Sequence, residues 1–170
     1  GARFKLIATD GVFSMDGDVA PLVEIGRLAR EHDAMLIVDD AHATGILGEG
    51  GRGLSGEADV VIGTFSKALG GFGAYVACSD TLRDYLINRC TGLIYSTALP
   101  PPVLGAVDAA LDLVPSLDAE RVQVASLADR VEESALHGLP PVLGGHGPLL
   151  DLEGGPLRRV LAEPREEELA

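Results

Sequence analysis

Three short apolar runs, the first two separated by a segment of helical spacing, constrain the fold of this chain most. Residues 4–9, 34–38 and 60–62 are apolar and partly β-branched, as in buried strands. Pro21 suits the first turn of a helix, and apolar residues recur at helical spacing over 22–29. Strand, helix and strand in this order indicate an α/β fold with a mostly parallel sheet covered on both faces.

The carboxyl ends of the predicted parallel strands hold polar residues. Right-handed crossovers place Asp10, Asp39 and Thr64 at the same edge of the sheet. Open α/β sheets bind their ligands outside that edge. The sequence therefore predicts a functional site beyond the ends of these strands.

Later segments of the chain add further elements. Residues 74–78 are typical of another strand, and Ser79 can cap the helix that follows it. Residues 93–95 are predicted to be short and extended. The prolines that open the segment 100–114 suit the beginning of a helix, and Asp118 caps a further helix.

The charge and hydropathy of the chain exclude several classes of partner. The net charge of −13 argues against nucleic acid, because phosphate backbones attract clustered Lys and Arg. No apolar run approaches the roughly 18 residues that a membrane-spanning helix needs. The first residues lack the pattern of a signal peptide, so a cytoplasmic location is the default expectation.

Three loops after the predicted strands carry groups that can do chemistry. The first contains Ser14, the second contains Asp39, Asp40 and His42 in the run DDAHATG, and the third contains Lys67 in the run TFSKALGG. The aspartates and the histidine could bind a divalent metal, cap a helix or bind a cofactor. A lysine taken alone is usually a surface residue, so the order and spacing of the three loops carry the interpretation.

Pyridoxal phosphate (PLP) requires this combination of groups. A carboxylate beside its ring nitrogen keeps that nitrogen protonated, so that the ring can accept electrons. Its phosphate binds hydroxyls and the backbone N–H groups of glycine-rich turns. Its aldehyde carbon reacts with a neutral lysine amine. The combination therefore predicts a PLP site, with a divalent-metal site at the aspartates and His42 as the alternative.

Five motifs of the chain resemble those of the α-oxoamine synthase family. They are TDGVFSMDGD (9–18), VDDAHATG (38–45), GEGGRG (48–53), GTFSKALGG (63–71) and LIYSTALPP (93–101). The resemblance covers residues 4–114 and implies a fold-type I PLP enzyme that condenses an amino acid with an acyl-CoA and releases CO2. The fold that it implies is part of the large domain of a PLP-dependent transferase of the aspartate aminotransferase type.

The resemblance assigns the catalytic roles to three residues and implies no metal ligand. Lys67 would bind the cofactor covalently and later remove the α-proton of the bound amino acid. Asp39 would pair with the pyridinium nitrogen. His42 would hydrogen-bond the phenolic oxygen of the ring and help to hold the substrate carbonyl.

Further residues match positions that contact the cofactor in this family. Ser14 would contact the cofactor and Thr64 its phosphate, with Ser66 as a lesser phosphate candidate. Ser96 and Thr97 match positions that reach the phosphate bound by the partner subunit. The resemblance therefore implies a homodimer.

The resemblance also predicts how the chain divides. Residues 1–114 would form the carboxyl-terminal part of the large domain, and residues 115–136 a helix leading toward a small domain. Residues 137–170 are rich in Gly and Pro and end in an acidic stretch, so we expect them to be poorly ordered. A ring-stacking histidine, a glycine-rich phosphate turn and a carboxylate-binding arginine of the family have no counterpart. We therefore expect either part of a longer enzyme or a truncated, non-catalytic remnant.

The substrates are the least constrained part of the prediction. The runs LIYSTALPP and FGAYVACS favour the family member that joins L-alanine to pimeloyl-CoA in biotin synthesis. The alternative is glycine C-acetyltransferase, which joins glycine to acetyl-CoA. The resemblance leaves the length of the acyl chain open.

Overall fold

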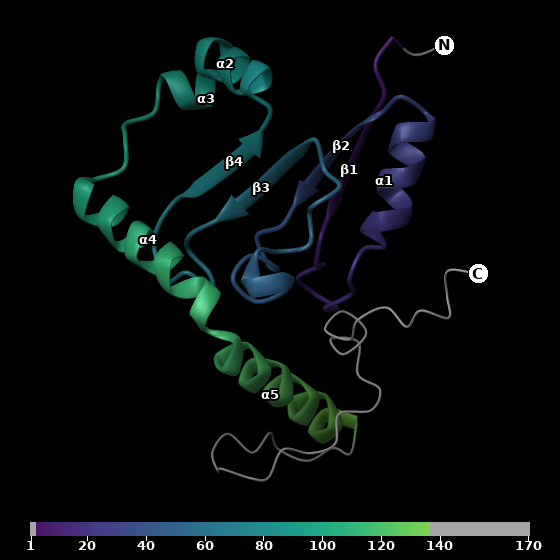
Figure 1. Ribbon diagram of the computed structural model, residues 1–170, viewed down its shortest axis with the longest axis vertical. Helices are drawn as coiled ribbons and strands as arrows, with labels where there is room; N and C mark the ends of the chain where they lie inside the picture. Colours follow the sequence, from purple (N-terminus) through teal and green to yellow (C-terminus); the bar gives the residue numbers. More distant parts are fainter. Residues whose placement is uncertain (1–2, 137–170) are drawn as a thin grey trace. The chain divides into compact units, whose positions relative to one another are not determined.

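Four strands form one sheet in the computed structural model, which describes residues 3–136 (Figure 1). In their order across the sheet they are β1 (Leu6–Asp10), β2 (Met35–Asp39), β3 (Val60–Thr64) and β4 (Ala74–Cys78). Each of the four coincides with an apolar run of the sequence. The strand predictions are therefore confirmed.

The first three strands are parallel, and their register places the predicted polar residues at one edge. Asp10 lies opposite Asp39, and Asp39 lies opposite Ile62, two residues before the end of β3 at Thr64. Strand β4 runs antiparallel to β3 (Figure 1). The link over 65–73 contains no helix, and a parallel return needs a crossover of about a dozen residues or more.

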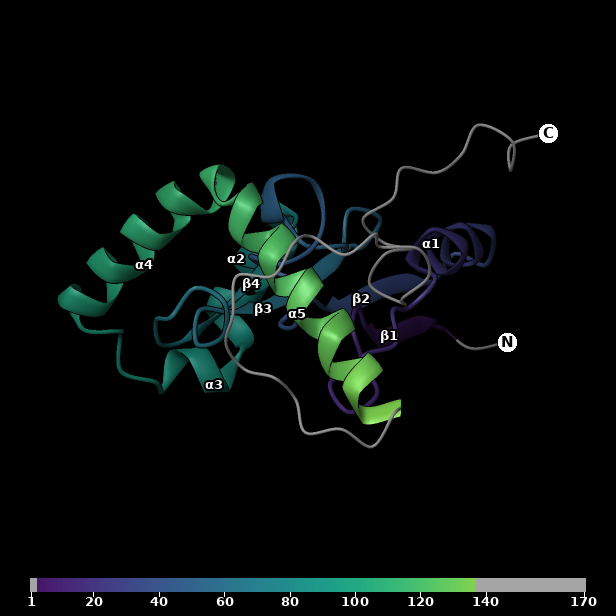
Figure 2. The same cartoon turned by 90° about the horizontal axis from the view of Figure 1, so that it is seen from below.

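The buried core lies between the sheet and α1 (Leu22–Glu31), and Pro21, predicted in the first turn of this helix, is its N-cap residue. Figure 2 shows α1 beside β1 and β2. Leu22 and Ala29 of the helix pack with Leu36 and Val38 of β2, and all four side chains are buried. Such a cluster is the main source of stability of an α/β unit, because each buried aliphatic side chain contributes about 1.5–3 kcal/mol.

The other face of the sheet is only partly covered within the described residues, which differs from the expectation of two covered faces. Alternation along the strands places Leu6, Met35 and Val76 on that face, and they are 59%, 42% and 51% exposed. The connection from β2 to β3 contains only the short 3₁₀ turn η1 (Glu49–Gly51). It therefore supplies no second covering helix.

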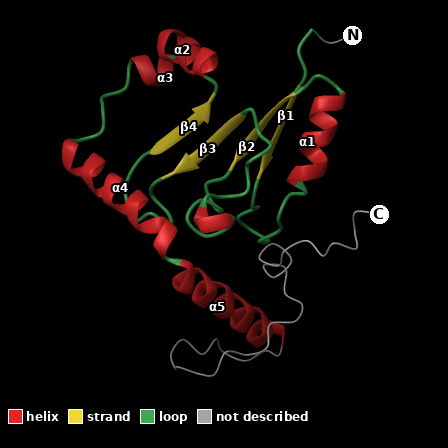
Figure 3. Cartoon of the chain, viewed as in Figure 1, coloured by secondary structure: helices red, strands yellow, loops and turns green. Residues whose placement is uncertain are grey.

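Helices follow the sheet along the chain (Figure 3). They are α2 (Asp80–Arg89), α3 (Thr91–Ile94), α4 (Pro101–Leu113), the 3₁₀ turn η2 (Val114–Ser116) and α5 (Asp118–Leu136). The Ser79 hydroxyl caps α2 as predicted, accepting a hydrogen bond from the N–H of Leu82. The expectation of an extended segment over 93–95 is wrong, because the N–H groups of Leu93 and Ile94 bond to the carbonyl of Cys90 in a helical turn.

The chain divides into two units, residues 1–116 and residues 117–170. The first contains the sheet and all the predicted site residues. The described part of the second is α5. The tail over 137–170, predicted to be poorly ordered, lies outside the described residues. No helix between residues 3 and 136 combines the length and apolar character needed to cross a bilayer.

Candidate active site

Asp39 ends β2 between the ends of two neighbouring strands. Its side chain is partly buried, and Oδ1 accepts a hydrogen bond of 3.0 Å from the backbone N–H of Ala41. Its Oδ2 receives no hydrogen bond from any residue that the structure describes. The carboxylate is therefore held at the sheet edge with one oxygen available to a donor.

Asp40 lies on the opposite side of the chain from Asp39 and is fully buried. Its carboxylate accepts hydrogen bonds of 3.0 Å from the N–H of Leu54 and from the hydroxyl of Ser55. Burial raises the pKa of the Asp40 carboxyl above its ordinary value, and these hydrogen bonds offset part of the rise. Asp40 is therefore unavailable to a metal beside Asp39 and His42, and the metal interpretation loses one of its three ligands.

His42 lies in a turn that begins at Asp40. The N–H groups of Ala43 and Thr44 bond to the Asp40 carbonyl at 3.0 and 2.9 Å, and the Thr44 hydroxyl bonds to it at 3.0 Å. The imidazole itself is exposed. The turn therefore presents His42 to solvent at the same edge as Asp39.

Thr64 closes the loop that carries Lys67. Its hydroxyl donates to the carbonyl of Gly73 at 2.9 Å and accepts from the N–H of Ser66 at 3.2 Å. The hydroxyl of Ser66 lies 2.7 Å from that of Thr64. Because the Thr64 proton is directed at Gly73, the exposed Ser66 offers the more accessible hydroxyl to a phosphate.

Lys67 is exposed in the loop between β3 and β4. Two backbone hydrogen bonds hold this loop, from the N–H of Phe65 to the carbonyl of Gly73 at 3.0 Å and from the N–H of Gly71 to the carbonyl of Phe65 at 2.7 Å. Within residues 3–136 the Lys67 amine makes no hydrogen bond or ion pair. It is therefore open to an electrophile that arrives from solvent.

The remaining residues predicted to contact the cofactor are Ser14, Ser96 and Thr97, and all three are exposed. Ser14 lies in the turn after β1, beyond the end of that strand. Ser96 and Thr97 lie between α3 and α4, and no hydrogen bond joins either side chain to another described residue. Their neighbour Leu99 packs against Gly73, where a Cβ would lie 2.9 Å from the Leu99 Cδ1. The structure thus brings the loops of β1, β2 and β3 to one edge, and no hydrogen bond joins the side chains of Ser96 and Thr97 to these loops.

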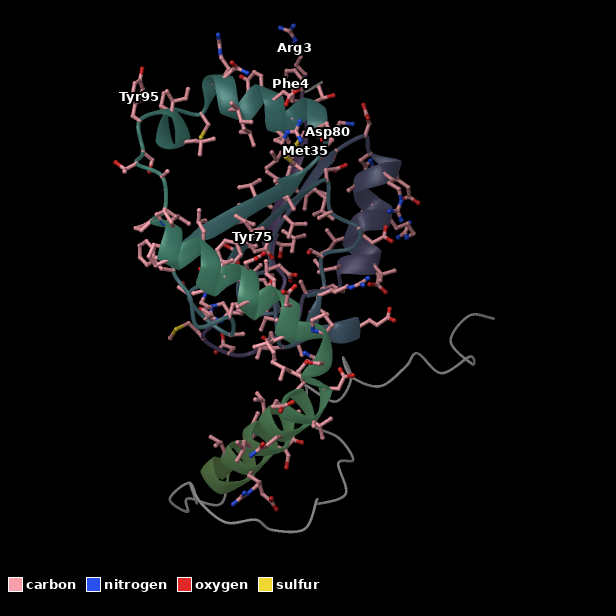
Figure 4. The ribbon with its side chains drawn as sticks, turned by 60° about the vertical axis from the view of Figure 1, so that its left-hand side comes forward. Arg3, Phe4, Met35, Tyr75, Asp80 and Tyr95 are labelled. Atoms are coloured by element: carbon pink, nitrogen blue, oxygen red, sulfur yellow. The ribbon has the colours of Figure 1, made fainter. Side chains whose placement is uncertain are left out.

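Tyr75 connects the two central loops and was not predicted from the sequence. Its ring covers Gly63 of β3, where a Cβ would lie 2.2 Å from it, and packs on Phe65 with 5.1 Å between ring centroids. Its hydroxyl lies 3.1 Å from the hydroxyl of Thr44. Figure 4 shows Tyr75 over the sheet. The available signal was the glycine inside the strand VVIGT, because such a glycine often marks the close approach of another group.

The groups at this edge of the sheet determine which chemistry the site can perform. A free lysine amine can attack an aldehyde, a half-buried carboxylate can accept a hydrogen bond from a protonated ring nitrogen, and hydroxyls can bind a phosphate. The edge therefore suits a phosphorylated aromatic aldehyde.

Known proteins resemble the chain over most of its length. The model of the family described as aminotransferase class I and II matches residues 1–143. The 8-amino-7-oxononanoate synthase of Gluconacetobacter diazotrophicus is 59% identical over 138 residues, which are 79% of this chain and 34% of that protein. The 8-amino-7-oxononanoate synthase of Trichlorobacter lovleyi is 55% identical over 125 residues, which are 70% of this chain and 32% of that protein.

A solved structure of SPT, a serine palmitoyltransferase, with a PLP internal aldimine also resembles the chain. The TM-score is 0.70 at 34% sequence identity, over 79% of this chain and 35% of that one. The chain therefore spans less than half the length of each of these relatives.

Proposed function

The chain belongs to the aminotransferase class I and II family, and on that basis we propose that it forms the lysine-bearing part of the PLP site of an α-oxoamine synthase. Its fold is part of the PLP-dependent transferase fold, as the sequence predicted. The observation that carries the proposal is the position of Asp39 and Lys67. Asp39 ends β2, and Lys67 lies in the loop that leaves the neighbouring parallel strand β3 at the same edge.

The groups at this edge fit PLP in their chemistry. The amine of Lys67 has no competing partner among the described residues, and one oxygen of Asp39 is open to a ring N–H. The hydroxyl of Ser66 is exposed beside that of Thr64. PLP, when bound, supplies a pyridinium ring that stabilises negative charge at the α-carbon of an amino acid.

Each residue then has a stated task. Lys67 Nζ would hold the cofactor at its aldehyde carbon and, once the amine of the amino acid has displaced it, would accept the proton of the α-carbon. Asp39 Oδ2 would accept the hydrogen bond of the ring nitrogen and keep it protonated. His42 would present its imidazole to the phenolic oxygen. Ser14 would contact the cofactor from the β1 loop, and Thr64 and Ser66 would contact its phosphate.

We extend the proposal to the reaction that joins L-alanine and pimeloyl-CoA and releases CO2 and CoA in biotin synthesis. The two relatives that are 59% and 55% identical are named 8-amino-7-oxononanoate synthases, which supports these substrates over glycine and acetyl-CoA. The proposal includes a homodimer in the cytoplasm. The exposed side chains of Ser96 and Thr97 support the dimer, because they are free to reach a partner's phosphate.

Covalent capture of PLP tests the cofactor site. The sequence contains two lysines, Lys5 and Lys67, and Lys5 lies before β1 at the opposite edge of the sheet, bonded to the carbonyl of His32. The purified chain is mixed with PLP, reduced with borohydride and digested, and the modified peptide is located by mass spectrometry. We expect the modification at Lys67, its persistence in Lys5→Ala and its loss in Lys67→Ala. Equal modification of both lysines would mean nonspecific capture and would refute the site.

A second assay tests the substrates. The protein expressed from its complete reading frame is offered L-alanine or glycine, each with pimeloyl-CoA or acetyl-CoA, and the free CoA thiol is measured. We expect release of CoA with L-alanine and pimeloyl-CoA. Faster release with glycine and acetyl-CoA would replace the substrate proposal but leave the PLP site intact.

A further inference from the structure

The buried carboxylate of Asp40 lies next to the proposed site without being part of it. It has no exposed surface, and no Lys, Arg or His of residues 3–136 forms an ion pair with it. Its bonds come instead from the N–H of Leu54, at 3.0 Å to Oδ2 and 3.3 Å to Oδ1, and from the Ser55 hydroxyl at 3.0 Å. A buried carboxylate that no cation compensates costs stability, so its presence calls for a physical role.

Two glycines fit closely around this carboxylate. A Cβ at Gly11, directly after β1, would lie 2.6 Å from Asp40 Oδ1. A Cβ at Gly53, in the loop before β3, would lie 1.9 Å from Oδ2. Three segments that are distant in sequence therefore meet at one side chain: the end of β1, the end of β2 and the loop that carries Leu54 and Ser55.

The backbone of Asp40 is held by hydrogen bonds to β3 and to the turn that follows β2. Its N–H bonds to the carbonyl of Ile62 in β3 at 2.7 Å, and its carbonyl accepts the bonds of the turn that contains His42. Asp39 precedes it directly. A movement of Asp40 would therefore displace both the carboxylate of Asp39 and the imidazole of His42.

The carboxylate suits this position better than an amide of the same shape. Oδ2 accepts from both the Leu54 N–H and the Ser55 hydroxyl, and Oδ1 accepts from the same Leu54 N–H at 3.3 Å. An asparagine has one acceptor oxygen, so with that oxygen at the Oδ2 position its NH2 group would face the Leu54 N–H, a donor against a donor. Asp40→Asn thus preserves the volume of the side chain and disturbs the anchoring.

We propose that Asp40 is a positioning residue of the cofactor site, which fastens the Asp39–His42 segment to the loop containing Leu54 and Ser55. It touches neither substrate nor cofactor and acts through Asp39 and His42. The inference rests on the proposed function, since it concerns how tightly and in what geometry PLP is held.

The variants that test this role differ in where they disturb the fold. Both anchor variants weaken the hydrogen bonds between Asp40 and the loop containing Leu54 and Ser55. Asp40→Asn changes the acceptor, and Ser55→Ala removes one of the donors. Asp59→Asn is the matched control, because the Asp59 carboxylate also accepts a backbone N–H, from Leu36 at 2.8 Å, but does so at the amino-terminal edge of β2 and β3. PLP affinity and the pH midpoint of the visible absorption of the bound cofactor are measured at a temperature where circular dichroism shows each variant folded.

We expect Asp40→Asn to weaken PLP binding about tenfold, because it removes the charge from the acceptor of these hydrogen bonds. We expect Ser55→Ala to weaken it about threefold, because it removes one donor and keeps the charged acceptor. Both variants should shift the pH midpoint of the absorption, because Asp39 and His42 would contact the ring. Asp59→Asn should lower the melting temperature and leave affinity and midpoint unchanged. A purely structural role of Asp40 would give the same pattern as Asp59→Asn.

The outcomes separate the inference from the function on which it rests. A wild-type chain that captures no PLP at Lys67 overturns the proposed function, and the inference falls with it. A wild-type chain that captures PLP, with affinity and midpoint unchanged in both anchor variants, overturns the inference alone. Should Asp40→Asn fail to fold, Ser55→Ala decides, because it removes one hydroxyl and keeps the carboxylate.

Discussion

The loop that follows β2 and the loop that follows β3 leave the same edge of the sheet but are held in different ways. The first is anchored through the buried side chain of Asp40. The second is closed mainly by backbone hydrogen bonds between Phe65, Gly71 and Gly73, and its residues Ser66 to Ala68 are exposed.

This difference follows from what each loop carries. A carboxylate and an imidazole that orient a ring must keep a fixed direction, since a misplaced group loses its hydrogen bond. A lysine that attacks a carbon atom must approach and withdraw, so it is better left without partners. We therefore expect changes in the β2 loop to alter stability, and changes at Lys67 to alter chemistry alone.

The largest expected loss of stability comes from adding a methyl group at Gly53, next to the buried carboxylate of Asp40. Gly53 has a φ of +85°, and an added Cβ would lie 1.9 Å from Asp40 Oδ2. Gly53→Ala should cost about 3 kcal/mol or more, because a left-handed backbone costs an alanine about 1–2 kcal/mol and overpacking about 1–3 kcal/mol. Urea unfolding monitored by circular dichroism measures this cost.

Gly50 supplies the control for Gly53→Ala in the same loop. Its φ is +58°, but a Cβ added there would have no atom within 4 Å. Gly50→Ala should therefore show the backbone cost of about 1–2 kcal/mol without the steric part. Equal losses of stability in the two variants would mean that the structure around Asp40 adjusts to the added methyl group. The β2 loop would then be held no more firmly than the β3 loop.

The second prediction concerns the pH dependence of stability. Burial raises the folded-state pKa of Asp40 above its ordinary value of 3.8, so the folded chain binds the proton more tightly than the unfolded chain. Stability should therefore fall as the pH rises from the unfolded pKa through the folded pKa, and change no further above it. Urea unfolding at a series of pH values should show this fall in the wild type and its loss in Asp40→Asn.

The control for the pH series again uses the opposite edge of the sheet. Asp59→Asn keeps Asp40, so the fall attributed to Asp40 should persist in it. An unchanged slope in Asp40→Asn would show that other groups produce the pH dependence.

The difference between the loops bears on what the sequence could predict. The three parallel strands and α1 were predictable, because the apolar runs of the strands are short and continuous and clear helical spacing separates the first two. The common edge of Asp39 and Lys67 followed from the handedness of crossovers. The inward position of Asp40 was not predicted, because a continuous apolar strand does not reveal which of two adjacent aspartates shares the buried face of Leu36 and Val38.

Other parts of the molecule gave weaker signals. The direction of β4 depends on the absence of a helix between it and β3, which the glycine-rich run suggested only indirectly. The residues over 93–95 are too few to show a period, so their apolar character could not distinguish a strand from the helical turn that they join. The anchoring partners Leu54 and Ser55 lie in a loop, and no pattern connects a loop residue to a distant carboxylate.

A third and smaller effect tests whether the two loops are coupled. Tyr75 touches Thr44 of the first loop and Phe65 of the second. Tyr75→Phe removes its hydroxyl and should cost about 0.5–1.5 kcal/mol, the usual net value of one hydrogen bond. Tyr95→Phe is the control, since Tyr95 is 85% exposed and projects from the first unit (Figure 4). Equal stability of the two variants would show that the hydrogen bond between Tyr75 and Thr44 does not couple the loops.

The smallest expected effect on stability occurs at Lys67. Its side chain is exposed and unpaired among residues 3–136, so Lys67→Ala should change the free energy of unfolding by no more than about 0.5 kcal/mol. The same change should abolish covalent capture of PLP, and Lys67→Arg should abolish it too, because a guanidinium keeps the charge but remains protonated and is a poor nucleophile. Unfolding and mass spectrometry on one preparation measure both properties. A loss of stability comparable to that of Gly53→Ala would show that Lys67 is held by the fold, and the division between an anchored orienting loop and a free reactive loop would fail.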